Sequence, residues 1–127
     1  MDAPVSSVMT QCVFTVDTQD TIEKVEAVMN SHGLSSVPVV DEQNITFGII
    51  SAADLVHFHS GKKNPKAVRA WEMCTYKPLE ASPDVPIREV AALMVDHHIH
   101  HVIVTEHRVV KGFVSSLDLI RHCCLGR

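Results

Sequence analysis

The chain has 127 residues, a length that fits one compact domain or a pair of very small ones. Hydrophobic residues make up 46% and charged residues 20%, which is globular composition and excludes a disordered chain. The net charge of −4, with histidine counted as neutral, argues against nucleic acid as a partner. Neither a signal peptide nor a membrane-spanning apolar run is recognisable, so we expect a cytoplasmic protein without membrane contact.

The four cysteines are Cys12, Cys74, Cys123 and Cys124, and none of them forms a C-x-x-C pair. The adjacent Cys123 and Cys124 are poorly placed to bond each other. We therefore interpret all four as free thiols in a reducing compartment.

The first half of the chain predicts a short strand, a helix, two strands joined by a polar turn, and a second helix. Asp20 and Glu23 have capping-box spacing at the start of the first helix. An apolar stripe at helical period follows them, and it includes Val25 and Met29. The expected elements of this half are a strand at 12–16, a helix from about 20, strands at 37–40 and 45–50, and a helix at 51–58.

The second half repeats the first. A helix with Pro86 in its first turn carries the same apolar stripe, and strands at 102–104 and 109–114 and a helix at 115–123 follow. Residues 60–65 read as a linker, and 66–74 as a short helix around Trp71. The pairs of identical residues include Thr10 with Thr75, Val25 with Val90, Met29 with Met94, Val37 with Val102, Gly48 with Gly112, Ser51 with Ser115, and Asp54 with Asp118.

Each copy alone has too little core to be stable. We therefore expect an α+β fold in which two β-α-β-β-α repeats pack about a pseudo-twofold axis. The expected boundaries are 1–61 for the first repeat with its N-terminal segment, 62–74 for the linker and connecting helix, and 75–127 for the second repeat.

The most informative motif is Gly-x-x-Ser-x-x-Asp, found at Gly48–Asp54 and again at Gly112–Asp118, where a strand runs into a helix. Ser-x-x-Asp is a capping box, so the motif has a purely structural interpretation. The same geometry also suits a sugar phosphate, because a helix N-terminus offers unpaired N–H groups and the aspartate accepts hydrogen bonds from ribose hydroxyls. Glycine within a strand allows close approach of a ligand or of a neighbouring backbone.

These motifs, together with Val8-Met9-Thr10 and Ser36-Val37-Pro38-Val39-Val40-Asp41, resemble a tandem pair of cystathionine-β-synthase (CBS) domains, the Bateman module. The resemblance covers roughly residues 5–123. It implies a regulatory, non-catalytic module that binds AMP, ADP, ATP or S-adenosylmethionine in clefts between the repeats and acts through a homodimer or a regulated partner protein. Which of these ligands binds, whether one or both sites fill, and whether the dimer is parallel or antiparallel stay open.

The resemblance also assigns site residues. Asp54 and Asp118 match the ribose-binding carboxylates of the family, and Ser51 and Ser115 match its phosphate-side hydroxyls. In the second repeat, Ile103 stands in place of Pro38. The residues that match adenine-lining segments are Cys12, Val13, Phe14, Ser36, Val37 and Pro38 for the first repeat, and Lys77, Pro78, Leu79, His101, Val102 and Ile103 for the second.

Two other interpretations come from the residues themselves. If the Ser-x-x-Asp segments only cap helices, the chain is a ligand-free dimerisation or scaffold module. The nine histidines suggest the hypothesis of a metal or pH sensor. On a strand, His98 and His100 would share a face, as would His57 and His59. No recognisable zinc spacing or catalytic arrangement accompanies them, so we expect no metal and no enzyme activity.

Overall fold

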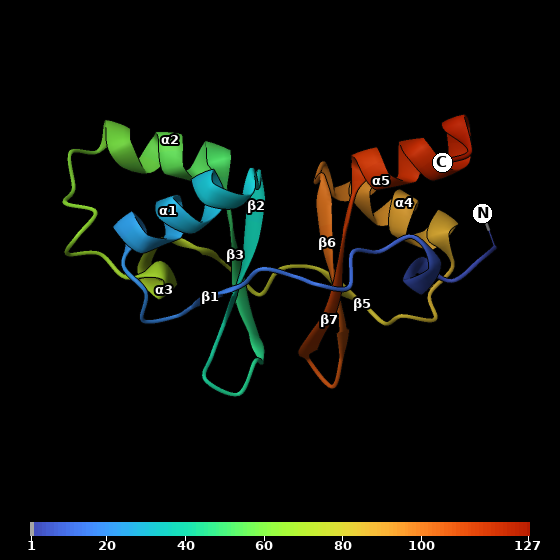
Figure 1. The fold of residues 1–127 in the computed structure, drawn as a ribbon, viewed down its shortest axis with the longest axis horizontal. Helices are drawn as coiled ribbons and strands as arrows, with labels where there is room; N and C mark the ends of the chain where they lie inside the picture. Colours follow the sequence, from blue (N-terminus) through green and yellow to red (C-terminus); the bar gives the residue numbers. More distant parts are fainter. Residues whose placement is uncertain (1) are drawn as a thin grey trace. The chain divides into compact units, whose positions relative to one another are not determined.

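The expected β-α-β-β-α order occurs twice along the chain, which makes the fold α+β (Figure 1). The computed structural model describes residues 2–127. The chain forms two compact units. We call residues 14–78 the first-repeat unit, and residues 2–13 together with 79–127 the second-repeat unit.

The first-repeat unit contains a four-stranded sheet with the strand order β1-β2-β3-β4. Strand β1 runs parallel to β2, and the other neighbours are antiparallel. The elements of this unit are β1 (Val16–Asp17), α1 (Ile22–His32), β2 (Ser36–Val40), β3 (Thr46–Ser51), α2 (Ala52–Ser60), α3 (Ala70–Met73) and β4 (Thr75–Tyr76).

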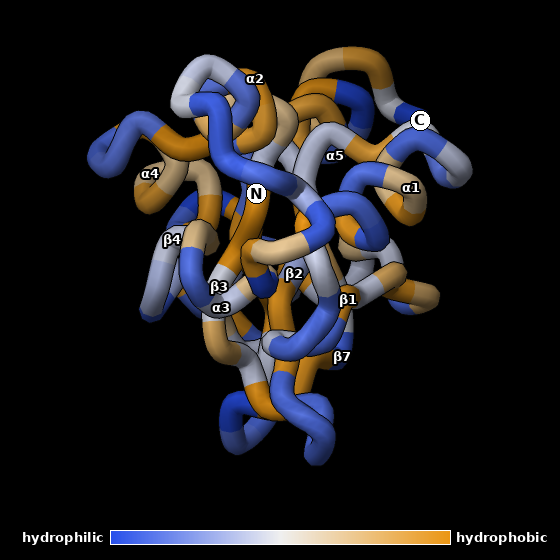
Figure 2. Tube along the Cα trace, turned by 90° about the vertical axis from the view of Figure 1, so that its left-hand side faces the viewer, coloured by the Kyte–Doolittle hydropathy of each residue, from blue (hydrophilic) through white to orange (hydrophobic). Residues whose placement is uncertain are grey.

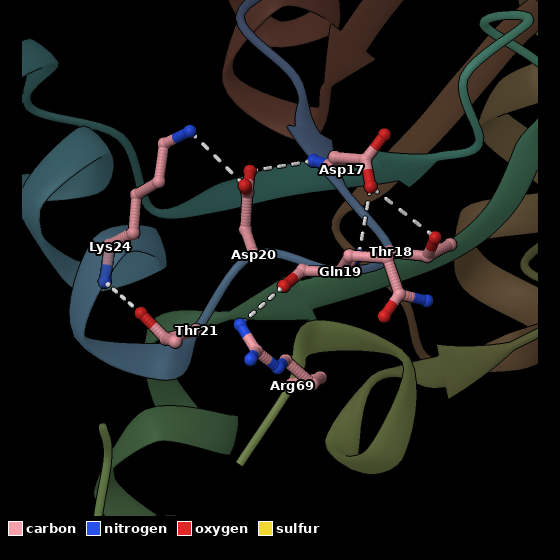
Figure 3. A network of polar contacts seen from close by, with 7 residues as sticks. All are labelled: Asp17, Thr18, Gln19, Asp20, Thr21, Lys24 and Arg69. Atoms are coloured by element: carbon pink, nitrogen blue, oxygen red, sulfur yellow. Dashed lines mark hydrogen bonds and ion pairs between the residues drawn. The ribbon is translucent and has the colours of Figure 1, made fainter. Parts of the chain in front are cut away.

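Helix α1 begins one residue later than the sequence indicated. Thr21 is its N-cap and accepts a hydrogen bond from the backbone N–H of Lys24 at 3.2 Å, so the predicted capping box of Asp20 and Glu23 is wrong. The carboxylate of Asp20 instead accepts from the backbone N–H of Asp17 at 2.8 Å and pairs with Lys24 at 3.1 Å (Figure 3). Asp20 therefore organises the loop before the helix. Gly33 ends α1 in the left-handed conformation, at a φ of 62°.

The core of the first-repeat unit lies where α1 covers the sheet. The apolar stripe of α1, Val25 and Met29, packs with Val37 and Val39 of β2 and Ile50 of β3. Strands β2 and β3 are accordingly hydrophobic along most of their length, and the turns are polar (Figure 2). In β3 burial alternates along the strand, whereas every residue of β2 is buried. Strand β2 is therefore the central element of this unit.

The second-repeat unit contains a three-stranded sheet with the strand order β5-β6-β7. Ile87, Val90 and Met94 of its first long helix pack against Val102, Val104 and Val114 of the sheet. The elements of this unit are the 3-10 turn η1 (Val5–Ser7), β5 (Glu80–Ala81), α4 (Ile87–His97), β6 (His101–Glu106), β7 (Val109–Ser115), α5 (Ser116–Ile120) and the π-helical turn η2 (Arg121–Leu125).

The N-terminal segment packs with the second repeat and not with the first. The backbone N–H of Val5 donates to the Val85 carbonyl at 2.8 Å, Thr10 pairs with Phe113, and the Val5 side chain is fully buried in the second core (Figure 1). The compact units thus divide the chain differently from the expected boundary, which placed residues 1–61 in one body. The repeat boundaries in the sequence themselves stay a prediction.

Three expected elements are shorter than the patterns indicated. The strand expected at 12–16 is only β1, because β1 pairs with β2 at just two positions, Val16 with Val39 and Asp17 with Val40. The helix expected at 66–74 is only α3, because Arg69 before it is extended and bridges to Thr21. The helix expected at 115–123 changes after Ile120 into η2.

Candidate functional site

Both Ser-x-x-Asp motifs form complete capping boxes. At α2 the Ser51 hydroxyl accepts from the backbone N–H of Asp54 at 3.2 Å, and the Asp54 Oδ2 accepts from the backbone N–H of Ser51 at 2.8 Å. At α5 the corresponding distances for Ser115 and Asp118 are 3.1 Å and 2.8 Å. The capping that the motif predicts is therefore confirmed, and it fixes one oxygen of each aspartate against the backbone.

The second carboxylate oxygen differs between the two motifs. Asp118 Oδ1 accepts from the Arg121 guanidinium at 3.3 Å, and the Asp118 side chain is about one quarter exposed. No hydrogen bond to Asp54 Oδ1 occurs within residues 2–127. The negative charge of Asp54 also reaches Cys74, whose thiol pKa is raised by burial and, to a lesser extent, by that charge. Asp54 is thus a half-buried acceptor with one oxygen available.

In each unit, the strand register places the start of the first hairpin strand beside the start of the helix that follows the hairpin. Ser36 lies opposite Ser51 in the β2–β3 ladder, and the backbone N–H of Ala52 donates to the Ser35 carbonyl at 2.9 Å. In the second-repeat unit His101 lies opposite Ser115. Each unit therefore gathers its predicted serine, its aspartate and the start of its central strand at one end of its sheet.

Most strand residues of the predicted site are covered. Ser36, Val37 and Pro38 are buried, and so are Val102 and Ile103, so their side chains pack the sheet. Phe14 is different, because its ring is 47% exposed and stacks on His32 with a centroid distance of 3.7 Å. In the first-repeat unit Phe14 is thus the predicted adenine-lining residue with an accessible aromatic face.

Two predicted segments are divided between the units. Cys12 and Val13 belong to the second-repeat unit, whereas Phe14 begins the first. Lys77 and Pro78 end the first-repeat unit, where the Lys77 N–H donates to the Phe47 carbonyl at 3.2 Å, and Leu79 begins the second-repeat part. Within a single unit, the structure therefore does not bring Lys77 and Pro78 together with His101.

The two motif glycines are explained by neighbours inside their own units. A Cβ atom at Gly48 would lie 2.5 Å from the Cys74 sulfur and 2.7 Å from the Thr75 carbonyl oxygen, because β4 approaches closely there. A Cβ at Gly112 would meet the Met9 side chain at its sulfur. The expected approach of a neighbouring backbone is therefore observed at Gly48, whereas a side chain approaches Gly112.

His101 has a distinctive environment. Its ring stacks on Phe113 at 5.1 Å with an interplanar angle of 10°, and its pKa is lowered mainly by burial, further by His100, and partly restored by the charge of Asp118. An aromatic pair therefore stands beside Asp118, where the first-repeat unit has the smaller Ser36.

The histidine pairs do not lie on strands, which was the condition for their sharing a face. His57 and His59 are in α2, and His98 is the left-handed C-cap of α4, at a φ of 54°. His59 contacts Glu26 of α1 at 2.5 Å, an exposed contact between helices. In the described part of the chain no three His, Cys, Asp or Glu side chains gather as a metal site.

Sequence reasoning did not find a pocket of about 310 Å³ in the first-repeat unit, which we call the α2 pocket. The sequence does contain charged residues in and after the linker, Lys63 and Glu72. Their spacing alone does not show that they lie with Asp54 around one pocket. Its apolar lining residues are Phe58, Val68 and Met73, and its polar ones are Asp54, His57, Lys63 and Glu72.

Comparison with known proteins identifies the fold family. The sequence model of the CBS domain family matches residues 5–61 and again residues 70–124. The chain belongs to the CBS domain family. Its two repeats are the two CBS domains of a pair. No helix within residues 2–127 combines the length and the apolar character that crossing a bilayer demands.

Relatives of this CBS pair include proteins of different size. The uncharacterized protein YlbB of Bacillus subtilis is 30% identical over 101 residues, which are 79% of this chain and 68% of YlbB. Inosine-5′-monophosphate dehydrogenase of Halobacterium salinarum is 33% identical over 110 residues, which are 85% of this chain but only 21% of that enzyme. The chain thus spans about two thirds of one relative and about a fifth of the other.

Solved structures of CBS pairs superpose closely on this chain. The pair of protein MJ0100, in complex with 5′-methylthioadenosine and S-adenosylmethionine, has a TM-score of 0.86 at 26% identity, covering 94% of this chain and 98% of that one. CBSX2 in complex with AMP has a TM-score of 0.88 at 16% identity, covering 98% and 99%. The second similarity establishes the fold alone.

Proposed function

We propose that this CBS pair is a regulatory module that binds an adenosine-type ligand through the aspartates of its capping boxes. The observation that carries the proposal is the geometry at Asp54. One of its oxygens is held by the Ser51 N–H, and the other accepts no hydrogen bond within residues 2–127. A carboxylate fixed in this way is oriented before a ribose diol arrives, so little ordering cost remains on binding.

The MJ0100 pair supports the same proposal, because that protein binds two adenosine derivatives with the same fold at 26% identity. The accessible ring of Phe14 in the same unit supplies a flat apolar face for a purine base. We propose that ligand binding acts on a homodimer or on a regulated partner, by favouring one of two assembly states.

Asparagine variants separate ligand binding from helix capping. In Asp54→Asn the amide oxygen still accepts from the Ser51 N–H, but the available oxygen is replaced by an NH₂ group that cannot accept from ribose hydroxyls. We expect AMP, ADP, ATP, S-adenosylmethionine or 5′-methylthioadenosine to raise the melting temperature of the wild type. A ligand at 100 times its Kd stabilises the folded state by about 2.7 kcal/mol.

The double variant Asp54→Asn, Asp118→Asn is expected to lose this ligand-induced shift while melting close to the wild type without ligand. Asp41→Asn is the matched control, because Asp41 Oδ1 only accepts backbone hydrogen bonds in the β2–β3 turn. No shift of the wild type with any adenosine ligand, or a full shift of the double variant, would favour the alternative of a ligand-free dimerisation module. The complete capping boxes are the observation behind that alternative.

A further inference from the structure

The α2 pocket has an unequal distribution of charge. Asp54 and Glu72 each contribute a carboxylate, and Lys63 contributes one ammonium group, with the imidazole of His57 beside them. Arg69 precedes Glu72 but is directed elsewhere, because its guanidinium donates to the Gln19 carbonyl at 3.0 Å in the loop before α1 (Figure 3). Fixed negative charge therefore exceeds fixed positive charge in this pocket.

Both carboxylates are held by the backbone. Asp54 Oδ2 accepts from the Ser51 N–H, and Glu72 Oε1 accepts from the Arg69 N–H, each at 2.8 Å. Each therefore keeps a second oxygen, Asp54 Oδ1 and Glu72 Oε2, for which residues 2–127 provide no hydrogen bond. Acceptors oriented in this way favour a ligand that carries hydroxyl or ammonium donors.

The remaining lining is apolar. Phe58 is 7% exposed, and Val68 and Met73 are partly buried beside it. A volume of about 310 Å³ is at the small end for a ligand pocket, so it suits a substituent better than a whole nucleotide. A short methylene or thioether chain can pack against this apolar surface. A polyphosphate would make no apolar contact with it and would place its negative charges beside two carboxylates.

We propose that the α2 pocket receives the 5′ substituent of an adenosine whose ribose is held by Asp54, and that it selects a sulfonium or amino-acid substituent over a polyphosphate. This inference rests on the proposed function. Glu72 pairs with the ammonium group, Lys63 with the carboxylate, and Phe58 contacts the aliphatic chain. S-adenosylmethionine has all three features, with a sulfonium charge that the excess of carboxylates favours.

Titration calorimetry with four ligands tests the selection. S-adenosylmethionine is expected to bind at least about tenfold more tightly than 5′-methylthioadenosine, which lacks the amino-acid group, and than ATP. S-adenosylhomocysteine, which lacks the sulfonium charge, is expected to lie between S-adenosylmethionine and 5′-methylthioadenosine. Glu72→Gln keeps the acceptor for the Arg69 N–H and removes only the charge. It should weaken S-adenosylmethionine about tenfold and leave 5′-methylthioadenosine unchanged.

Two further variants complete the test. Glu89→Gln is the matched control, because Glu89 is also an acidic residue in a first helical turn but does not line the pocket. Lys63→Met is expected to weaken the two amino-acid ligands and leave 5′-methylthioadenosine unchanged. Tighter binding of ATP than of S-adenosylmethionine, or weakening of ATP by Lys63→Met, would overturn the inference and indicate a phosphate subsite.

The outcomes also separate this inference from the function on which it rests. If 5′-methylthioadenosine binds and Asp54→Asn abolishes that binding, but the amino-acid group adds no affinity, only the pocket assignment fails. If none of the four ligands binds the wild type, and AMP and ADP do not bind either, the proposed function fails together with the pocket assignment.

Discussion

At the scale of single residues, Gly48 is constrained by its own sheet. A Cβ there would lie 2.7 Å from the Thr75 backbone oxygen, which cannot move without displacing β4, and 2.5 Å from the Cys74 sulfur. We expect Gly48→Ala to lower the free energy of unfolding by about 1 to 3 kcal/mol, because overpacking forces the two strands apart. Urea denaturation of the purified variant measures this change.

Gly112→Ala is expected to cost less than Gly48→Ala, because the atoms it meets belong to the flexible side chain of Met9. Gly61→Ala is the control, since its Cβ would meet only the Phe58 carbonyl oxygen, at 3.4 Å. Equal costs for Gly48→Ala and Gly61→Ala would show that close packing of β4 does not explain the glycine.

His101 makes stability depend on pH at the same scale. Its pKa in the folded protein lies below the unfolded value of about 6.5, because burial disfavours the imidazolium form. As the pH falls through that range the unfolded chain binds the proton first, so stability decreases until the pH is below the folded pKa. The groups with which it interacts oppose each other, since His100 lowers the pKa and Asp118 raises it.

We therefore expect His101→Gln to flatten the loss of stability between about pH 7 and pH 5 relative to the wild type. Urea denaturation at a series of pH values gives the difference curve, and an NMR titration of the His101 ring gives its pKa directly. His122→Gln is the control, because that histidine is exposed. A titration midpoint for His101 above 6.5 would contradict the sign of this effect.

At the scale of elements, the capping serines are expected to hold the helices that carry the aspartates. Ser51→Ala removes the acceptor for the Asp54 N–H and should lower the free energy of unfolding by about 1 kcal/mol. Ser51→Thr keeps a hydroxyl and should cost less. Melting curves of both variants compare the two effects, and similar losses for alanine and threonine would mean that the hydroxyl does not act as a cap.

Helices and strands were predictable where a periodic pattern meets a local capping signal. The Ser-x-x-Asp boxes and the apolar stripes of α1 and α4 are both confirmed. The start of α1 was not, because Asp20 and Thr21 are both capping types and only the loop contacts of Asp20 with Asp17 decide between them. Sequence spacing alone cannot distinguish two adjacent cap candidates when contacts within the preceding loop and the first helical turn select one.

The candidate site shows the same limit. Its aspartates and serines follow from a repeated local motif, whereas the α2 pocket depends on how the linker returns to α2. Lys63 lies in the expected linker and Glu72 in the expected short helix, and only the fold places both with Asp54 around one pocket. Long-range convergence of charges carries no periodic signal.

At the scale of the whole molecule, the tandem repeat was evident in the sequence, but the packing of the N-terminal segment was not. Val5 looks like one apolar residue in a short polar segment, yet it is fully buried with Ile87, Val90 and Val102. A repeat alignment assigns each residue to the copy that is adjacent in sequence. Residues 2–13 pack instead with a sheet that lies more than 60 positions further on.

Val5→Ala is therefore expected to destabilise the second-repeat unit, although Val5 precedes the first repeat in the chain. Removing two methyl groups from a fully buried site should cost about 2 kcal/mol. Hydrogen exchange followed by mass spectrometry should show that exchange in α4, β6 and β7 speeds up relative to the wild type, and that exchange in α1, β2 and β3 changes less. Val25→Ala is the matched control, because Val25 is equally buried in the first core and should give the opposite pattern. If Val5→Ala accelerates exchange mainly in α1 and β2, the N-terminal segment packs with the first repeat, and the assignment of residues 2–13 is wrong.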